Sequence, residues 1–405
     1  MTRSHVLCIV ENNSVPKDIR VWREAHAIRQ WDIKVSIISP RSERDSLPFE
    51  KREGIEIYRY PNIEFIHGKA AFIAEYLNAL FWQSVLALKI FIHHPFQVIH
   101  AANPPDMIFL LAWFYRLFGT RFIFDHHDLS PEVYLSRFSG RKDLFYHMLY
   151  LCEKLSCRTA DAIISTNRSF KDIVMKRHGI EGKRFHIVRN DPVHRETPQQ
   201  EDYHSEALGD ESIVIGYLGT INPQDGVDIL IEAAALLVHD MNVHNLKYLI
   251  MGDGDALQSV RNKVREMKLD PYVDFTGFIH EKSIIHSNLA RTDICVEPAP
   301  DNEMNRYSTF IKIMEYMEAG KPIVAFDLRE TRYSSGGSAL LVEPKDTRGF
   351  AGAIKQLVDA PELRRQLGET GKKRIRKALN WDKAAEELKE AYISLGMIRQ
   401  HMEVR

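Results

Sequence analysis

Short apolar runs alternate with amphipathic stretches along most of the chain, which is the pattern of strands that are each followed by a helix. The runs expected to form buried strands lie at residues 6–10, 34–39, 55–59, 98–100, 121–125, 162–166, 185–188, 213–218, 247–251, 273–276, 294–296 and 323–326. Because strands and helices alternate in this order, the pattern predicts an α/β protein with parallel sheets. The stretch at 196–210 is polar and poor in apolar residues, so it predicts a linker between two domains, residues 1–195 and 211–380.

The clearest helix-then-strand signal lies between Asn305 and Asp327. Ser308 is expected to be the N-cap of the helix, Gly320 the residue just past its C-terminus and Pro322 a stop beyond it. At about 100° per residue, one stripe of this helix is apolar and the opposite stripe is polar. The apolar stripe comprises Phe310, Ile313, Met314 and Met317, and the opposite stripe comprises Ser308, Lys312, Glu315 and Ala319.

The polar stripe carries candidate binding chemistry. Ligands of parallel sheets sit beyond the carboxyl ends of the strands, where helix N-termini offer free N–H groups to a phosphate. Ser308, Thr309 and Lys312 would point towards such a phosphate. On spacing alone, an amphipathic helix with Lys312 and Glu315 on a solvated face is an equally good interpretation.

Glycine-containing loops follow several strands of the second domain. Gly219 follows the run at 213–218, while Gly252 and Gly254 follow the run at 247–251. Glycine lets backbone N–H groups approach phosphate oxygens, so these positions are further binding candidates. The first loop of the chain lacks a Gly-x-Gly-x-x-Gly motif, which disfavours a nicotinamide enzyme.

Composition narrows the class of protein. A chain of 405 residues with a formal charge of −1 is expected to form two domains, and it does not favour a nucleic-acid partner. The four cysteines have no Cys-x-x-Cys spacing, and no carboxylate cluster with divalent-metal spacing stands out, so neither a disulfide framework nor a metal site is predicted. The first apolar run is too short for a signal peptide, and we therefore expect a cytoplasmic setting.

The stretch between His67 and Pro95 is rich in aromatic residues and helical in pattern. Polar residues interrupt it too often for a helix that spans a bilayer. We favour a buried helix. The alternative is a helix that rests on the surface of a membrane, where the protein would meet a lipid-linked acceptor.

Residues 312–327, KIMEYMEAGKPIVAFD, resemble the nucleotide-sugar signature of glycosyltransferase family four. The resemblance implies the GT-B fold, with two Rossmann-like domains that face a central cleft and a final segment from Trp381 that returns to the first domain. It implies that Glu315 holds the ribose of the donor nucleotide. The first glutamate of the family motif falls on Tyr307, so Tyr307, Asn305 or free backbone N–H groups would meet the donor sugar instead. Gly277 and Phe278 resemble the loop that receives the nucleobase.

Two segments of the first domain also resemble the family. Asp18, Arg20, Val21 and Glu24 match an Asp-x-Arg-Val-x-x-Glu pattern, in which Arg20 would reach a donor phosphate. An arginine on the helix surface, paired with Glu24, is an equally good interpretation. His127, beside Asp128, matches a histidine that lies over the donor sugar, and Glu132 would shape the acceptor side. Without the resemblance, His126 and His127 would be interpreted as loop residues that cap the next helix.

The resemblance implies a retaining glycosyltransferase without a cofactor or a metal. It would move a sugar from a nucleotide diphosphate, UDP rather than GDP, to a sugar or lipid-linked sugar acceptor in surface polysaccharide assembly. His127, Lys312 and Glu315 would act in catalysis. Thr220 and Asp225 occupy positions where many members of the family have phosphate-binding cations, which leaves Lys312 as the main candidate in its domain. A catalytically inactive partner subunit and a sugar-nucleotide 2-epimerase are the alternatives.

Overall fold

The computed structural model describes residues 4–62, 69–104, 106–137, 142–192 and 212–398. The chain divides into two compact units, Met1–Asn190 with Asp382–Arg405 and Asp191–Trp381. The predicted boundaries at 195 and 381 lie close to these divisions, and the predicted linker at 196–210 lies outside the described residues. Each unit is an α/β domain, which confirms the predicted fold class.

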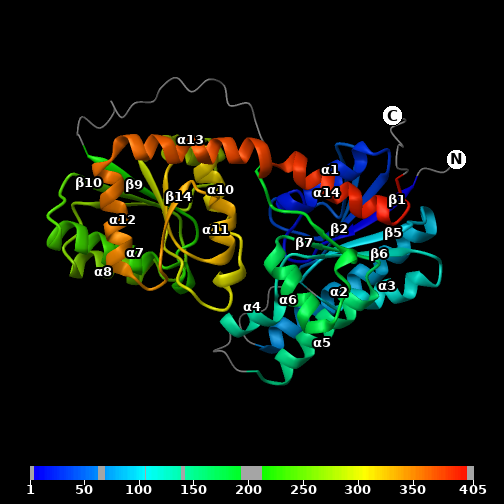
Figure 1. Cartoon of the computed structure of the whole chain (residues 1–405). Coiled ribbons are helices and arrows are strands. Elements are labelled where there is room, and N and C mark those ends of the chain that lie inside the picture. The colour runs from blue at the N-terminus through cyan, green and yellow to red at the C-terminus, as the bar shows by residue number, and fades with distance from the viewer. Residues whose placement is uncertain (1–3, 63–68, 105, 138–141, 193–211, 399–405) are drawn as a thin grey trace, which may run out of the picture. The chain divides into compact units, whose positions relative to one another are not determined.

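The N-terminal unit is built on an eight-stranded sheet (Figure 1). Its elements are β1 (His5–Ile9), α1 (Ile19–Gln30), β2 (Lys34–Pro40), β3 (Phe49–Arg52), β4 (Ile55–Tyr60), α2 (Lys69–His93), β5 (Val98–Ala102), α3 (Phe109–Arg116), β6 (Arg121–His126), α4 (Ser130–Arg137), α5 (Leu144–Thr159), β7 (Ala162–Ser165), α6 (Arg168–His178) and β8 (Phe185–Ile187), joined by α14 (Trp381–Ser394). The strand order is β3-β4-β2-β1-β5-β6-β7-β8, and only β3 runs antiparallel to its neighbour. The strand order reverses between β1 and β5, so loops at this point can bind a ligand.

The C-terminal unit has a six-stranded, wholly parallel sheet in the order β11-β10-β9-β12-β13-β14. Its elements are β9 (Ile213–Leu218), α7 (Val227–Ala235), β10 (Leu246–Met251), α8 (Leu257–Glu266), β11 (Val273–Gly277), α9 (Lys282–Ala290), β12 (Ile294–Glu297), α10 (Ile311–Glu318), β13 (Ile323–Phe326), α11 (Arg329–Ser335), β14 (Ala339–Val342), α12 (Thr347–Asp359) and α13 (Pro361–Ala378). One apolar cluster joins the sheet to α7, α8 and α12, and a second joins it to α10. Here the strand order reverses between β9 and β12.

The predicted helix after Asn305 exists, but its start was wrong. Asn305–Tyr307 form one turn of 3-10 helix, and α10 begins only at Ile311. The Ser308 hydroxyl donates to the Met304 carbonyl at 2.7 Å, so Ser308 closes the short turn and does not cap α10. Gly320 has a φ of +71°, which confirms it as the residue past the helix end. Ile313, Met314 and Met317 are fully buried, as the apolar stripe predicted.

All four cysteines, Cys8, Cys152, Cys157 and Cys295, are buried free thiols. No helix among the described residues is long and apolar enough to cross a membrane. The preference for a buried helix between His67 and Pro95 was wrong in part: α2 buries one face, while Leu77, Phe81 and Ile92 are 54–69% exposed.

Candidate functional site

Lys312 is mostly buried at the carboxyl ends of β9 and β12, with its side chain 11% exposed. Its Nζ is 3.0 Å from Oε2 of Glu297 and donates to the Tyr217 hydroxyl at 3.1 Å. The ammonium also lies 4.4 Å from the centre of the Tyr217 ring. Burial alone would lower the pKa of Lys312, but Glu297 and Tyr217 outweigh burial and raise it. The lysine is therefore a charged, pre-positioned cation and does not lie on a solvated face.

Tyr316 explains why Lys312 reaches this position. Tyr316 follows Lys312 by one helical turn and is fully buried. Its hydroxyl accepts the Leu218 N–H at 2.8 Å and donates to the Val296 carbonyl at 3.3 Å. Both partners are strand residues, so Tyr316 holds α10 across the ends of β9 and β12.

Two glycines make room for this arrangement. Gly219 and Gly252 have φ angles of +146° and +151°, which residues with a side chain rarely adopt. A Cβ at Gly219 would lie 2.8 Å from Lys312 Cε, and a Cβ at Gly252 would lie 1.8 Å from the Gly219 carbonyl oxygen. The loops after β9 and β10 can therefore pack together above the lysine only because both positions are glycine.

Glu315 lies on the same helix and is half-buried. Its side chain makes no hydrogen bond or ion pair with the part of the chain that the structure describes, but Lys282 and His286 of α9 lie near enough to interact with its charge. Burial raises the pKa of Glu315, and these two groups act in the opposite direction. An available carboxylate beside a buried cation suits a ligand with hydroxyl and phosphate groups.

The other predicted donor residues are distributed around these groups. Asn305 is buried, and its amide donates to the backbone carbonyls of Gln224 and Pro300 at 2.8 and 2.9 Å, so it braces a loop. Thr220 donates to the Asp225 carboxylate at 2.8 Å. Phe278 is 65% exposed next to Gly277 after β11, which leaves its ring accessible to a base. Gly254 packs against the Ile221 carbonyl, and Tyr307, Ser308 and Thr309 are partly buried before α10.

In the N-terminal unit, the adjacent residues His126 and His127 at the end of β6 direct their side chains to opposite sides of the sheet. His126 is fully buried, and its Nε2 lies 3.0 Å from a Glu153 oxygen. His127, the next residue, faces the opposite way, and its side chain is 14% exposed. Asn103 receives the backbone N–H groups of His127 and Asp128 at 2.8 and 3.1 Å. The structure therefore makes His127 the accessible histidine of the pair.

Arg20 is buried and does not lie on the helix surface. Its guanidinium donates to both oxygens of Asp125, at 2.9 and 2.8 Å, and to Val188 and Asn190. It also forms an ion pair with Glu24 at 3.2 Å. These partners use its N–H groups, which leaves none directed at a donor phosphate. The predicted pairing with Glu24 is thus present, but inside the protein.

Glu24, His100 and Asp125 bring one ligand atom each to within 4.8 Å of the others, a spacing that could hold a metal ion. The Arg20 guanidinium already bonds both Asp125 oxygens. A second cation would therefore meet strong repulsion at this cluster.

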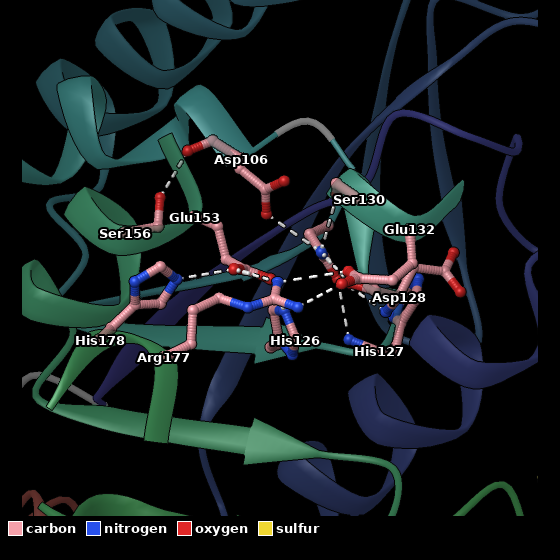
Figure 2. A network of polar contacts seen from close by, with 11 residues as sticks. Asp106, His126, His127, Asp128, Ser130, Glu132, Glu153, Ser156, Arg177 and His178 are labelled. Atoms are coloured by element: carbon pink, nitrogen blue, oxygen red, sulfur yellow. Dashed lines mark hydrogen bonds and ion pairs between the residues drawn. The ribbon is translucent and has the colours of Figure 1, made fainter. Parts of the chain in front are cut away.

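Glu132 belongs to an ionic network with Arg177, Glu153 and His178 (Figure 2). Arg177 pairs with Glu132 and with Glu153, in the second case at 2.9 Å, and His178 lies 2.7 Å from Glu153. Burial alone would raise the pKa of Glu153, but His126, His178 and Arg177 lower it. Glu132 therefore anchors α4 to α5 and α6.

A polar cavity of about 420 Å³ opens at the carboxyl ends of β1, β5 and β6. Its lining includes Glu11, Asn12, Asn13, Glu75, Asp128 and Ser130. Burial and the charge of Glu75 raise the pKa of Glu11 to about 7. Carboxylates and amides suit the hydroxyl groups of a carbohydrate.

Sequence reasoning missed Glu297, Tyr217 and Asp125, which pair with predicted residues. Each lies in or directly after an apolar run, where a polar residue is unexpected unless it has a partner. That position was the available signal.

Two family models match the chain. Residues 19–190 match the Glycosyltransferase Family 4 model, and residues 212–360 match the Glycosyl transferases group 1 model. Between them they cover most of the sequence. The chain therefore belongs to the family-4, group-1 glycosyltransferases.

Curated relatives are distant. The chain is 26% identical over 257 residues to the alpha-D-kanosaminyltransferase of Streptomyces kanamyceticus, covering 60% of this chain and 63% of that protein. It is 22% identical over 270 residues to the capsular polysaccharide biosynthesis glycosyltransferase CapM of Staphylococcus aureus, covering 62% of this chain and 66% of that protein.

Solved structures resemble the chain over almost its whole length. Sucrose-phosphate synthase from Thermosynechococcus elongatus has a TM-score of 0.76 at 16% identity, covering 97% of this chain and 99% of that chain. Anabaena HepE in complex with UDP has a TM-score of 0.72 at 15% identity, covering 96% and 100%. The two Rossmann-like domains thus form the GT-B fold.

Proposed function

We propose that the protein is a retaining, metal-independent glycosyltransferase that uses a UDP-sugar. Lys312 carries this proposal, because it is a mostly buried cation at the strand ends that its counter-ion, Glu297, holds in place at 3.0 Å. In the proposed reaction Lys312 stabilises the departing diphosphate, Glu315 accepts hydroxyl groups of the ribose, and His127 contacts the donor sugar. The relative HepE has been solved with UDP, which supports the choice of base.

The acceptor is proposed to be a sugar or a lipid-linked sugar in surface polysaccharide or glycoconjugate assembly. The polar cavity beside Asp128 offers carboxylate and amide groups to its hydroxyls. The relative CapM is named for capsular polysaccharide biosynthesis, which supports the pathway class.

We also propose cytoplasmic, peripheral contact with a membrane. Exposed apolar side chains line α2 and α3, which meet at an apolar groove of about 320 Å³. We call these residues the α2–α3 apolar face: Leu77, Phe81, Val85, Leu88 and Ile92 of α2, and Leu110, Trp113, Phe114, Leu117 and Phe118 next to or on α3. The exposed Lys89 and Arg116 beside this face would favour anionic lipids.

Calorimetry with UDP and GDP tests the donor. A ribose hydroxyl bonded to a charged carboxylate is worth roughly 1.5–3 kcal/mol, so Glu315→Ala should weaken UDP binding about ten- to a hundred-fold. The exposed Glu266→Ala is the control and should bind UDP normally. Failure of every nucleotide to bind the wild type would favour an inactive partner subunit.

Activity assays test the remaining parts of the proposal. Hydrolysis of a panel of sugar nucleotides should identify the donor, and EDTA should leave its turnover unchanged. The anomeric configuration of the product, measured by NMR, should match that of the donor. Inversion, or loss of turnover in EDTA, would contradict the proposed mechanism.

A further inference from the structure

His127 lies against a buried group of polar residues to which the proposed function gives no role. Asp125 precedes it by two residues and is fully buried in β6. Because successive side chains of a strand alternate, Asp125 and His127 lie on the same side while His126 points away. His127 Nδ1 is 3.6 Å from Asp125 Oδ2, an ion-pair contact that is longer than a hydrogen bond.

Arg20 fixes the Asp125 carboxylate. Its Nε and Nη2 donate to the two Asp125 oxygens in parallel, and Nη1 is held by the Val188 carbonyl at 3.0 Å and by Asn190 at 2.8 Å. Burial alone would raise the pKa of Asp125, but Arg20 outweighs burial and lowers it. The carboxylate is thus ionised and cannot rotate away from His127 without losing a two-pronged ion pair.

Glu24 and His100 complete the buried charge balance. Burial and repulsion from Asp125 raise the pKa of Glu24 to about 8 although Arg20 lies beside it. Burial lowers the pKa of His100 to about 4. The most firmly ionised pair of the group is therefore Arg20 with Asp125, whose atoms are 2.8 Å apart.

The C-terminal helix takes part in this group. His100 Nε2 lies 3.5 Å from Glu24, and its Nδ1 is hydrogen-bonded at 2.8 Å to the hydroxyl of Tyr392, which is fully buried in α14. Tyr392 of α14 is thereby linked, through His100 and Glu24, to the residues that surround Asp125.

We propose that Asp125 is a positioning residue for His127, and that Arg20, Glu24, His100 and Tyr392 hold Asp125 in that role. A fixed carboxylate on the Nδ1 side favours the imidazole with its proton on Nδ1. Nε2 is then the ring atom offered to a substrate. The inference rests on the proposed function only where it assigns His127 to the donor sugar.

NMR of the histidine rings tests the inference without any substrate. In the wild type, ¹⁵N-labelled His127, assigned by its absence in His127→Gln, should carry its neutral-form proton on Nδ1 and titrate above the ordinary pKa of about 6.5. Burial and the charge of Arg20 lower the pKa of His127, but Asp125 and Asp128 raise it by more. Glu24 also lies near this histidine. A proton on Nε2, or a pKa at or below the ordinary value, would overturn the proposal, even for a chain that transferred no sugar.

Variants provide the second test. Asp125→Asn should lower the pKa of His127 and reduce kcat about ten-fold or more, with UDP affinity unchanged. Arg20→Lys keeps the charge but not the two parallel bonds, so it should also lower kcat at an unchanged donor KM. The matched control is Arg59→Lys, because Arg59 is equally buried, donates to Val15 and Glu50, and does not contact His127. An unchanged His127 pKa in Asp125→Asn, or equal losses of kcat in Arg20→Lys and Arg59→Lys, would show a merely structural role.

Discussion

At the scale of single residues, the proposed site depends on charges that are buried and already paired. Lys312 keeps its charge because Glu297 compensates for the lost water. A diphosphate that reaches Lys312 would find a cation that needs no reorganisation, which is the condition for strong electrostatic stabilisation. Removing one member of such a pair leaves the other charge buried without a partner, so a variant that tests one member should be combined with a variant of the other.

Lys312 and Glu297 can be separated by a pair of variants. Lys312→Met should lower turnover about 10²-fold or more and also destabilise the protein, because it leaves the Glu297 carboxylate buried and unpaired. Adding Glu297→Gln should recover most of the stability but none of the turnover. Thermal unfolding and donor hydrolysis measure the two effects, and recovery of turnover in the double variant would exclude a catalytic role for Lys312.

His127→Ala should lower turnover by about 10²-fold or more while nucleotide binding stays nearly intact, as for a group used mainly in the transition state. Steady-state kinetics and UDP calorimetry make the comparison. His147→Ala, an exposed histidine of α5, is the control and should behave as wild type. Near-normal turnover would remove His127 from the site.

Sequence reasoning at this scale found residues with a motif but not their partners. His127, Lys312 and Glu315 could be singled out because they stand next to strand ends or on a polar stripe. Glu297 and Asp125 stood out only as carboxylates at the end of apolar runs, and the partner of such a carboxylate cannot be identified until the sheet brings one close. The main partner of Arg20 was missed for the same reason: Asp125 lies 105 residues away in sequence.

At the scale of elements, hydrophobic periodicity predicted the strands and most helices, whereas the capping residue Ser308 gave the wrong start for α10. Ser308 has the chemistry of an N-cap, but its hydroxyl donates backward to the Met304 carbonyl, and Phe310, the residue at the N-cap position of α10, forms no side-chain cap. Tyr316 explains the difference, since its bonds to the two strands determine where α10 can lie. Tertiary contacts therefore decide the first turn of a helix whose buried stripe was correctly predicted.

The buried end of β1 makes the N-terminal unit sensitive to acid. His5 is buried between the His94 carbonyl and the Ser36 hydroxyl, with Lys34 and Glu56 also near, and burial lowers its pKa to about 4. The unfolded chain binds this proton near pH 6.5, so the contribution of His5 is complete above pH 6.5 and is lost as the pH falls towards 4. Between pH 7 and 5 the loss is about 2 kcal/mol.

His5→Asn tests this sensitivity, because it should remove the corresponding part of the pH dependence whatever it does to stability at pH 7. Urea unfolding can be followed by tryptophan fluorescence, since four of the five tryptophans, Trp22, Trp31, Trp82 and Trp113, belong to the N-terminal unit. A wild type and a variant that lose equal stability between pH 7 and 5 would contradict the assignment to His5.

At the scale of the whole molecule, the two units contribute different chemistry. The C-terminal unit presents a cation, an available carboxylate and glycine loops at its strand ends, which suits a nucleotide diphosphate. The N-terminal unit presents a histidine, a polar cavity and the α2–α3 apolar face. The assignment of nucleotide binding to the C-terminal unit could be predicted from the sequence only through the family resemblance. Helical pattern and composition do not show which residues of the two units meet a ligand.

The α2–α3 apolar face leads to the last prediction. Phe81 is 61% exposed, so Phe81→Ser should cost little stability, because it removes few buried contacts. If the face contacts lipid, the same change should weaken sedimentation with vesicles that contain anionic lipid. Phe49→Ser, which alters a 50% exposed aromatic residue on β3 of the same unit, is the matched control and should sediment as wild type. Thermal unfolding should be measured on both variants. A wild type that does not sediment, or an equal loss with Phe49→Ser, would contradict membrane contact and leave the apolar groove to some other partner.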